Sequence, residues 1–280
     1  MLLVFAHPDD EAFGCAGTMA EATGRGVPVT LITATRGEAG KTGDPRIDTP
    51  EILGSVREQE LRASMREVGV TDVRLLDYRD SGMDGTPENA DPRCLMQAPE
   101  ADVVVKLVVH LRAVRPATVV TFGPDGIYGH PDHLTIGRAA TAAVHAADPG
   151  YLPAVGDPWR VTAFYHAATP RGRLQAMAAR PNSPLRDLTP DQLTRVGTPR
   201  AEITTVVDIG ARRDVKERAI IAHRTQVGEG GPLAGMPSEQ REAWLSREHF
   251  VRVELPWHDP TAPTADLIAR LAAERPVAPA

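Results

Sequence analysis

Residues 2–10 read LLVFAHPDD, an unbroken apolar run followed by a polar tetrad. Five consecutive apolar residues are typical of a strand that is buried on both faces, as the strands of parallel sheets are. A helix is expected from Pro8 to about Thr23, with Gly24 and Gly26 ending it. A strand, a polar turn and a helix in this order form the repeating unit of an α/β protein.

The same unit recurs through residue 147. Strands are expected at 27–33, 73–76 and 117–122, and helices at 56–68, 101–114 and 133–147. Two segments rich in glycine, proline and charge, 36–52 and 79–100, are interpreted as long loops. This alternation predicts a Rossmann-like, doubly wound α/β fold, in which helices cover both faces of a mostly parallel sheet.

The rest of the chain is less regular. Strands are expected at 160–166 and 202–208, helices at 212–223 and 238–248, and a glycine-rich loop at 228–235. Neither a repeat of fold-defining length nor a clean linker divides the sequence. We therefore expect a single domain over residues 1–280, with a regular core at 1–147 and a less regular part at 148–280.

Composition argues against several classes of protein. The 280 residues are 42% hydrophobic, enough for one sizeable core, and carry a formal net charge of −6. A mildly acidic chain without a basic patch argues against nucleic acid as a partner. The two cysteines cannot build a disulfide framework, and no apolar run approaches the roughly 18 residues of a membrane span. Since its start lacks a signal-peptide pattern, we expect a soluble cytoplasmic protein without a membrane partner.

Two similar tetrads follow the first and fourth expected strands. Residues 7–10 read HPDD and residues 130–133 read HPDH. In both, proline stands where the first helical residue is expected, a position that tolerates it well. Ligands of open parallel sheets bind at the carboxyl ends of the strands. If strands one and four are neighbours, as in the common doubly wound order, the two tetrads meet.

Together the tetrads offer three imidazoles and three carboxylates. Two imidazoles and one carboxylate suit a divalent metal ion with open coordination positions, and one carboxylate and one imidazole would remain for proton transfer. Taken singly, Asp9 or Asp10 is more often a helix cap, and His133 a buried polar residue. Capping does not require the same frame at two strand ends, so the joint pattern favours a functional site.

The two motifs resemble those of a known family. AHPDDE at 6–11 and YGHPDH at 128–133 are similar to the PIG-L/LmbE-like zinc-dependent N-acetylglucosaminide deacetylases, which include enzymes of low-molecular-weight thiol biosynthesis. The resemblance covers most of residues 1–227, with further matching segments at 35–40, 57–61, 79–83, 157–159 and 222–227.

The resemblance implies a metal site with a separate base. The implied zinc ligands are His7, Asp10 and His133, with iron(II) as an alternative metal in the cell. Asp9 is the implied general base on the metal-bound water. A bound zinc ion polarises the amide carbonyl and lowers the pKa of its water to about 7.

The resemblance also implies groups for proton delivery and substrate contact. His130 would protonate the leaving amine or stabilise the oxyanion, with Asp132 orienting its ring. Tyr128 matches a mobile residue near the acyl carbonyl. Arg57 and Asp80 match positions that contact the sugar.

The expected function is therefore removal of the N-acetyl group from a small GlcNAc-containing molecule of the GlcNAc-inositol or GlcNAc-malate type. A homo-oligomer is one alternative for its assembly, and the oligomeric state stays open. An amidase of thiol S-conjugates is an alternative within the family. An Fe(II) oxygenase with two histidines and one carboxylate is an alternative from another class, as is a catalytically silent sugar- or metal-binding module. The roles of Glu11, Lys41, His223 and the loop 228–235 stay open.

Overall fold

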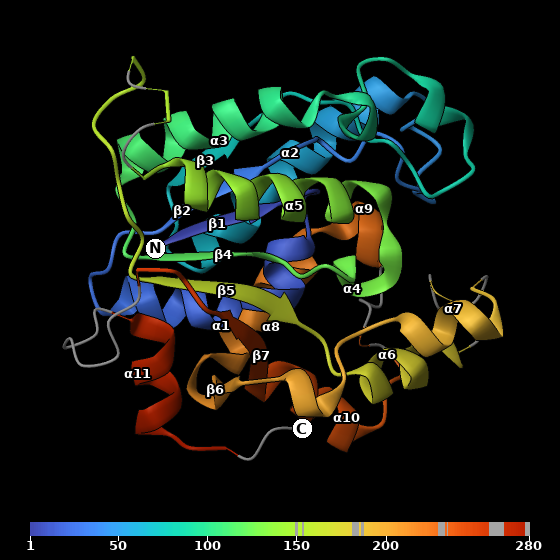
Figure 1. The fold of residues 1–280 in the computed structure, drawn as a ribbon. Coiled ribbons are helices and arrows are strands. Elements are labelled where there is room, and N and C mark those ends of the chain that lie inside the picture. The colour runs from blue at the N-terminus through green and yellow to red at the C-terminus, as the bar shows by residue number, and fades with distance from the viewer. Residues whose placement is uncertain are drawn as a thin grey trace.

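The computed structural model describes residues 1–148, 151–152, 154–180, 185, 188–228, 233, 235–257 and 266–277. Its centre is a seven-stranded sheet with the order β3-β2-β1-β4-β5-β7-β6 (Figure 1). The strands are β1 (Leu2–Phe5), β2 (Thr30–Thr33), β3 (Asp72–Leu75), β4 (Thr118–Phe122), β5 (Ala163–Ala168), β6 (Thr205–Asp208) and β7 (Arg247–Val253). The first five strands are parallel, whereas β7 runs antiparallel to both β5 and β6.

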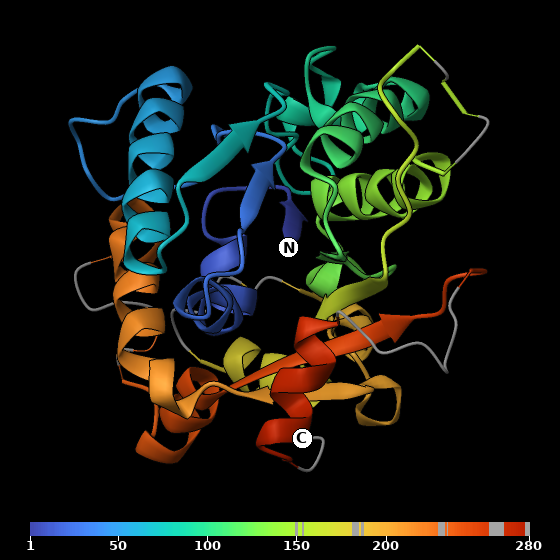
Figure 2. The same ribbon diagram turned by 90° about the vertical axis from the view of Figure 1, so that its left-hand side faces the viewer.

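Helices cover both faces of this sheet (Figures 1 and 2). They are α1 (Asp10–Gly24), α2 (Pro50–Glu67), α3 (Glu100–Val114), α4 (Gly126–Gly129), α5 (Pro131–Ala146), α6 (Arg171–Ala178), α7 (Pro190–Arg195), α8 (Arg213–Ala222), α9 (Arg224–Val227), α10 (Ser238–Ser246) and α11 (Leu267–Glu274). On one face α3 packs on α5, which lies over β1 and β4; on the other, α8 packs on α1 and α2. The predicted doubly wound, mostly parallel α/β fold is confirmed.

The core is built where the sequence is most apolar. All four residues of β1 are buried, and Phe5 meets Phe122 of β4 edge-to-face with the ring centroids 4.9 Å apart. Helix α5 approaches β4 closely because Gly137 has no side chain, since a Cβ there would lie 2.9 Å from the carbonyl oxygen of Phe122. This contact brings the first turn of α5 to the carboxyl end of the sheet.

Some element boundaries differ from the sequence predictions. Helix α2 begins at Pro50, inside the predicted loop 36–52, because the Thr49 side chain caps it by accepting from the Ile52 N–H. Helix α1 begins at Asp10. The prediction that it begins at Pro8 is therefore wrong by two residues. The prediction of helix through residue 248 is wrong after Ser246, where β7 begins.

The less regular part extends the central sheet. Helices α6, α7 and α11 were not expected from the sequence, and β6 and β7 pair only through long-range hydrogen bonds. Because all seven strands form one sheet, we infer a single domain.

Most of the predicted loop 228–235 lies outside the described residues. Within the described ranges, no helix combines the length and apolarity that crossing a bilayer requires.

Candidate metal centre

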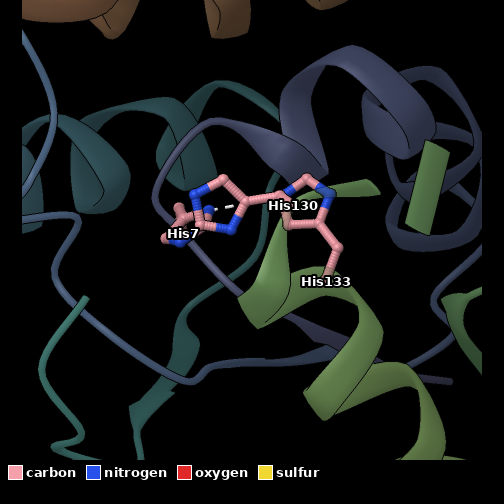
Figure 3. A group of neighbouring side chains, drawn as sticks. All are labelled: His7, His130 and His133. Carbon is pink, nitrogen blue, oxygen red and sulfur yellow. Dashed lines mark hydrogen bonds between the residues drawn. The ribbon is translucent and has the colours of Figure 1, made fainter. Parts of the chain in front are cut away.

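The two tetrads meet at the carboxyl edge of the sheet, as the sequence predicts for adjacent first and fourth strands. Strand β1 pairs directly with β4. The ring of His7 lies 4.5 Å from that of His130 and 5.2 Å from that of His133, centroid to centroid. Figure 3 shows the three imidazoles gathered between the strand end and the start of α5. All three are buried.

The side chains of three residues, His7, Asp10 and His133, bring potential ligand atoms close together. Nδ1 of His7 lies 3.3 Å from Nε2 of His133 and 3.7 Å from Oδ2 of Asp10. Nε2 of His133 lies 3.2 Å from Oδ1 of Asp10. Zinc bonds of about 2.0–2.2 Å in a tetrahedral arrangement place ligand atoms roughly 3.3–3.6 Å apart, which is close to these separations. The two imidazoles face different oxygens of the Asp10 carboxylate.

Two further groups in this cluster each place one ligand atom of every member within 4.8 Å of the others. His130 with His7 and His133 forms one, and His7 with Asp80 and Asp132 forms the other. The second group engages Nε2 of His7, whereas the set with Asp10 engages Nδ1. The structure thus contains a His/Asp cluster that can hold a divalent ion, with His7 common to every combination.

The orientation of His133 is determined by its surroundings. Its Nδ1 lies 3.0 Å from the carbonyl oxygen of Gly126, and its ring stacks on Phe122 at a centroid distance of 4.0 Å. A carbonyl only accepts, so Nδ1 carries the proton and donates it there, which leaves the Nε2 lone pair for a metal. The short helix α4 and strand β4 therefore set this side chain.

Two carboxylates contact Nε2 of His7, the ring nitrogen that does not face Asp10 and His133. Its Nε2 lies 3.1 Å from Oδ2 of Asp132 and 3.5 Å from Oδ1 of Asp80. Although burial alone lowers the pKa of His7, Asp80 and Asp132 raise it well above its usual range. A carboxylate on the far nitrogen of a histidine is the usual way to orient a metal ligand and increase its basicity.

The hydrogen bonds of His130 differ from those that the sequence resemblance implies. Its Nδ1 accepts a hydrogen bond from the backbone N–H of Asp132 at 3.1 Å. The Asp132 carboxylate instead accepts from the Ser81 backbone N–H and hydroxyl and faces His7. The expectation that this carboxylate orients His130 is therefore corrected, because it lies on the His7 side. Burial, reinforced by His7 and His133, lowers the pKa of His130 to about 2, so its neutral ring carries the proton on Nε2.

Asp9 has an unusual backbone conformation beside the cluster. Its φ of +125° is strained for a residue with a Cβ. Its backbone N–H donates to Oε2 of Glu11 at 3.0 Å, and Arg57 reaches its carboxylate at 3.3 Å and the carbonyl oxygen of Pro8 at 2.6 Å. Burial raises the pKa of Asp9 to about 6, with Arg57 opposing the rise. By contrast, the imidazole of His133 overcomes the effect of burial on Asp10 and lowers its pKa.

Glu11 and His223, whose roles the sequence left open, form a buried pair. Nε2 of His223 lies 2.8 Å from Oε1 of Glu11, and both residues are fully buried. The Glu11 carboxylate thus joins α1 and the loop after α8 to the strained Asp9. The signal that could have indicated this pairing is the matching segment 222–227. Lys41 is exposed, and its carbonyl oxygen lies 3.5 Å from the side-chain amide of Gln226.

The two residues expected to contact sugar lie deep in the protein. Arg57 and Asp80 are each 4% exposed. Arg57 donates to the carbonyl oxygen of Gly37 at 2.8 Å, and Asp80 accepts from the N–H groups of Gly82 and Ala39 at 2.8 and 3.2 Å. Both side chains therefore support the loops around the cluster in this structure, and their sugar contacts stay a prediction.

Tyr128 lies over the site from α4. Its half-buried ring is 5.0 Å from that of His133 and 6.2 Å from that of His130. The preceding Ile127 has a positive φ of 66°, and its carbonyl oxygen accepts from the Gly197 N–H at 2.6 Å. Burial, with Asp10 and Asp9 adding to it, raises the pKa of Tyr128 well above its usual range, so its hydroxyl stays protonated.

The fold and the cluster define an α/β protein with a candidate divalent-metal site at the switch point of its sheet. The family model described as PIG-L: GlcNAc-PI de-N-acetylase matches residues 2–144, and the chain belongs to this family. It is 38% identical over 265 residues to the 1D-myo-inositol 2-acetamido-2-deoxy-alpha-D-glucopyranoside deacetylase of Geodermatophilus obscurus, covering 89% of this chain and 90% of that protein. The resemblance stated from the two motifs is confirmed.

Solved structures share the fold at lower identity. The N,N'-diacetylchitobiose deacetylase from Pyrococcus horikoshii superposes with a TM-score of 0.59 at 21% identity, covering 90% of this chain and 82% of that one. The 4-carboxy-2-hydroxymuconate hydratase GalB from Pseudomonas putida gives a TM-score of 0.60 at 17% identity, covering 93% and 98%. A hydratase on the same fold means that the reaction has to be argued from the site.

Proposed function

We propose that this protein is a zinc-dependent N-deacetylase that releases acetate from a small GlcNAc-containing molecule. The observation that carries the proposal is the spacing of 3.2–3.7 Å among ligand atoms of His7, Asp10 and His133, with a further carboxylate, Asp9, beside them. Membership of a family described by de-N-acetylation supports the same reaction.

The metal would be held by His7, Asp10 and His133. Two imidazoles and one carboxylate leave positions open for water and substrate, and zinc and iron(II) both accept such a set. When bound, the metal supplies a Lewis acid for the acetamide carbonyl and a water with a pKa of about 7. Asp132 and Asp80 keep His7 in place through its far nitrogen.

Asp9 would take the proton from the attacking water. The side chain of Asp9 is one-fifth exposed, whereas that of its partner Arg57 is 4% exposed. The Asp9 carboxylate is therefore the more accessible of the two groups. Arg57 and Glu11 hold the peptide group between Pro8 and Asp9, Arg57 through its carbonyl oxygen and Glu11 through its N–H. A base that is positioned in this way, without being a ligand, can pass the proton to the leaving nitrogen.

His130 and Tyr128 would act on the acyl group. Because Nδ1 of His130 accepts from a backbone N–H, its Nε2–H is available as a donor to the carbonyl oxygen while negative charge develops there. The protonated hydroxyl of Tyr128 is a second candidate donor. Of the two roles expected for His130, this hydrogen-bonding pattern favours stabilisation of the oxyanion.

A GlcNAc-inositol conjugate is the leading candidate substrate, because the relative at 38% identity is named for deacetylation of such a compound. A GlcNAc-malate conjugate is the second candidate, and an amide of a thiol S-conjugate is the third. A cytoplasmic location and a homo-oligomeric state remain predictions.

Product analysis tests the proposed function. Zinc-loaded protein is incubated with GlcNAc, GlcNAc-inositol, GlcNAc-malate and an amide of a thiol conjugate, and primary amine and acetate are both measured. Equal amounts of amine and acetate are expected, without consumption of oxygen. Consumption of oxygen would support the oxygenase alternative, and absence of turnover from the fully metal-loaded protein would support a silent binding module.

A further inference from the structure

A cavity of about 250 Å³ is lined by residues of α6, of α10 and of the segment just before α10, in the less regular part. Its wall combines apolar side chains with two polar ones. Met177, Met236 and Trp244 supply apolar surface, and Arg173 and Gln240 supply hydrogen-bonding groups. Ligand pockets for drug-sized molecules are typically about 300–1,000 Å³, so this cavity has the size for a part of a ligand.

Arg173 contributes a partly exposed guanidinium to this wall. It lies over the ring of Trp244, 5.4 Å from the centroid, and no ion pair or hydrogen bond of its side chain occurs within the described part of the chain. Burial and the neighbouring Arg247 lower the pKa of Arg173 to about 10. A half-buried guanidinium without a carboxylate beside it can donate its five N–H groups to the oxygen atoms of a ligand.

Residues that line the cavity share packing neighbours with the candidate metal centre in two places. Phe13 lies one turn after Asp10 on α1, and its ring is 6.5 Å from that of Trp244. Met177 and Tyr128 pack against the same small apolar cluster under α6 and α7. Tyr128, which lies over the candidate metal centre, and Met177, which lines the cavity, thus pack against the same apolar residues.

We propose that this cavity is the subsite for the aglycone of the GlcNAc conjugate, which rests on the proposed deacetylase function. It takes a small oxygen-rich group, either a hydroxylated ring or a carboxylate-bearing chain, and Arg173 donates hydrogen bonds to its oxygen atoms. Gln240 contributes an amide donor and acceptor, and the indole and thioether groups contact the carbon frame. Arg173 is then a determinant of specificity that does not touch the reacting amide.

Steady-state kinetics of Arg173→Met test this assignment. For at least one of GlcNAc-inositol and GlcNAc-malate, kcat/KM should fall about 10- to 100-fold through a higher KM, the usual effect of losing one or two charge-assisted hydrogen bonds. For free GlcNAc, which has no aglycone, kcat/KM should stay unchanged. The conjugate with the larger loss identifies whether a carboxylate or a hydroxylated ring fills the cavity.

A matched control is Arg138→Met, which removes an exposed arginine on α5 that is paired with Glu100. It should leave all three substrates unaffected. An equal loss on free GlcNAc and on the conjugates, or no loss on either conjugate, overturns the subsite. Calorimetric binding of both conjugates to the zinc-loaded proteins repeats the comparison without turnover. If the wild type binds them but hydrolyses none, the deacetylase proposal fails, while a weaker affinity of Arg173→Met still supports the subsite.

Discussion

The tetrads at 7–10 and 130–133 have nearly the same letters and follow adjacent strands, yet they form different local structures. Pro131 is the first residue of α5, as proline at a helix start usually is. Pro8 lies two positions before α1, and Asp9 between them has a φ of +125° without a side-chain cap. The second tetrad is a regular helix start, whereas the first is a strained turn.

This difference assigns different tasks to equivalent positions. In the second tetrad the third residue, Asp132, is fully buried and its carboxylate faces His7 of the first tetrad. In the first tetrad the third residue, Asp9, keeps a partly exposed carboxylate. Strain in the backbone thus accompanies the group that we propose for proton transfer, and the relaxed turn carries a group that supports a ligand.

The largest expected effect is that of removing the proposed ligand that the second tetrad supplies. His133→Ala should lose the metal and reduce activity below detection, because a ligand contributes more to metal affinity than any outer partner does. Elemental analysis of the purified variant measures this directly. Retention of one metal ion per chain would show that the assignment of His133 as a ligand is wrong.

The next effect separates the third positions of the tetrads. Asp9→Asn should keep its metal and lower kcat by about 10² to 10⁴, the usual contribution of one positioned proton-transfer group. Metal content and kcat are measured on the same preparation. If the variant has the kcat of the wild type, Asp9 is not the base.

Asp132→Asn is the matching change in the second tetrad. We expect a metal affinity about 10- to 100-fold weaker, because the carboxylate supports His7, and a kcat that recovers when zinc is in excess. Titration with zinc under turnover conditions measures both quantities. A kcat that stays low at saturating zinc would show that Asp132 contributes to turnover by a route other than the support of His7.

A smaller effect is expected from loosening the strained turn. In Glu11→Gln the single amide oxygen can accept from Asp9 or from His223 but not from both, which leaves one buried donor unpaired. A loss of about 1–3 kcal/mol should lower the melting temperature by roughly 2–8 °C, with an unchanged metal content and a lower kcat at constant KM. Glu88→Gln, a change of the same type at an exposed position, is the control. Equal kcat values in the two variants would remove Glu11 from the positioning of Asp9.

Much of the first half could be predicted from local pattern. Its strands are short apolar runs, and their alternation with helices is compatible with few topologies. The common doubly wound order predicts that β1 and β4 are neighbours and that the tetrads meet, and β1 does pair with β4. Strand β7 was not predicted because Arg247 and Glu248 interrupt the apolar pattern of its sequence. Glu248 is nevertheless buried, since it accepts from the Gly17 and Thr18 N–H groups and pairs with Lys216 at 2.9 Å.

The amino-acid sequence by itself determined the fold class, the family and the cluster of histidines and aspartates, because these depend on periodicity and on motifs at strand ends. Only the tertiary structure decided which nitrogen of each imidazole faces the candidate metal position, that Asp132 supports His7, and that Glu11 pairs with His223. It also placed Arg173 over Trp244, 71 residues away in the chain. Such contacts join residues distant in sequence, and their geometry follows from the packing of whole elements, which no local pattern contains.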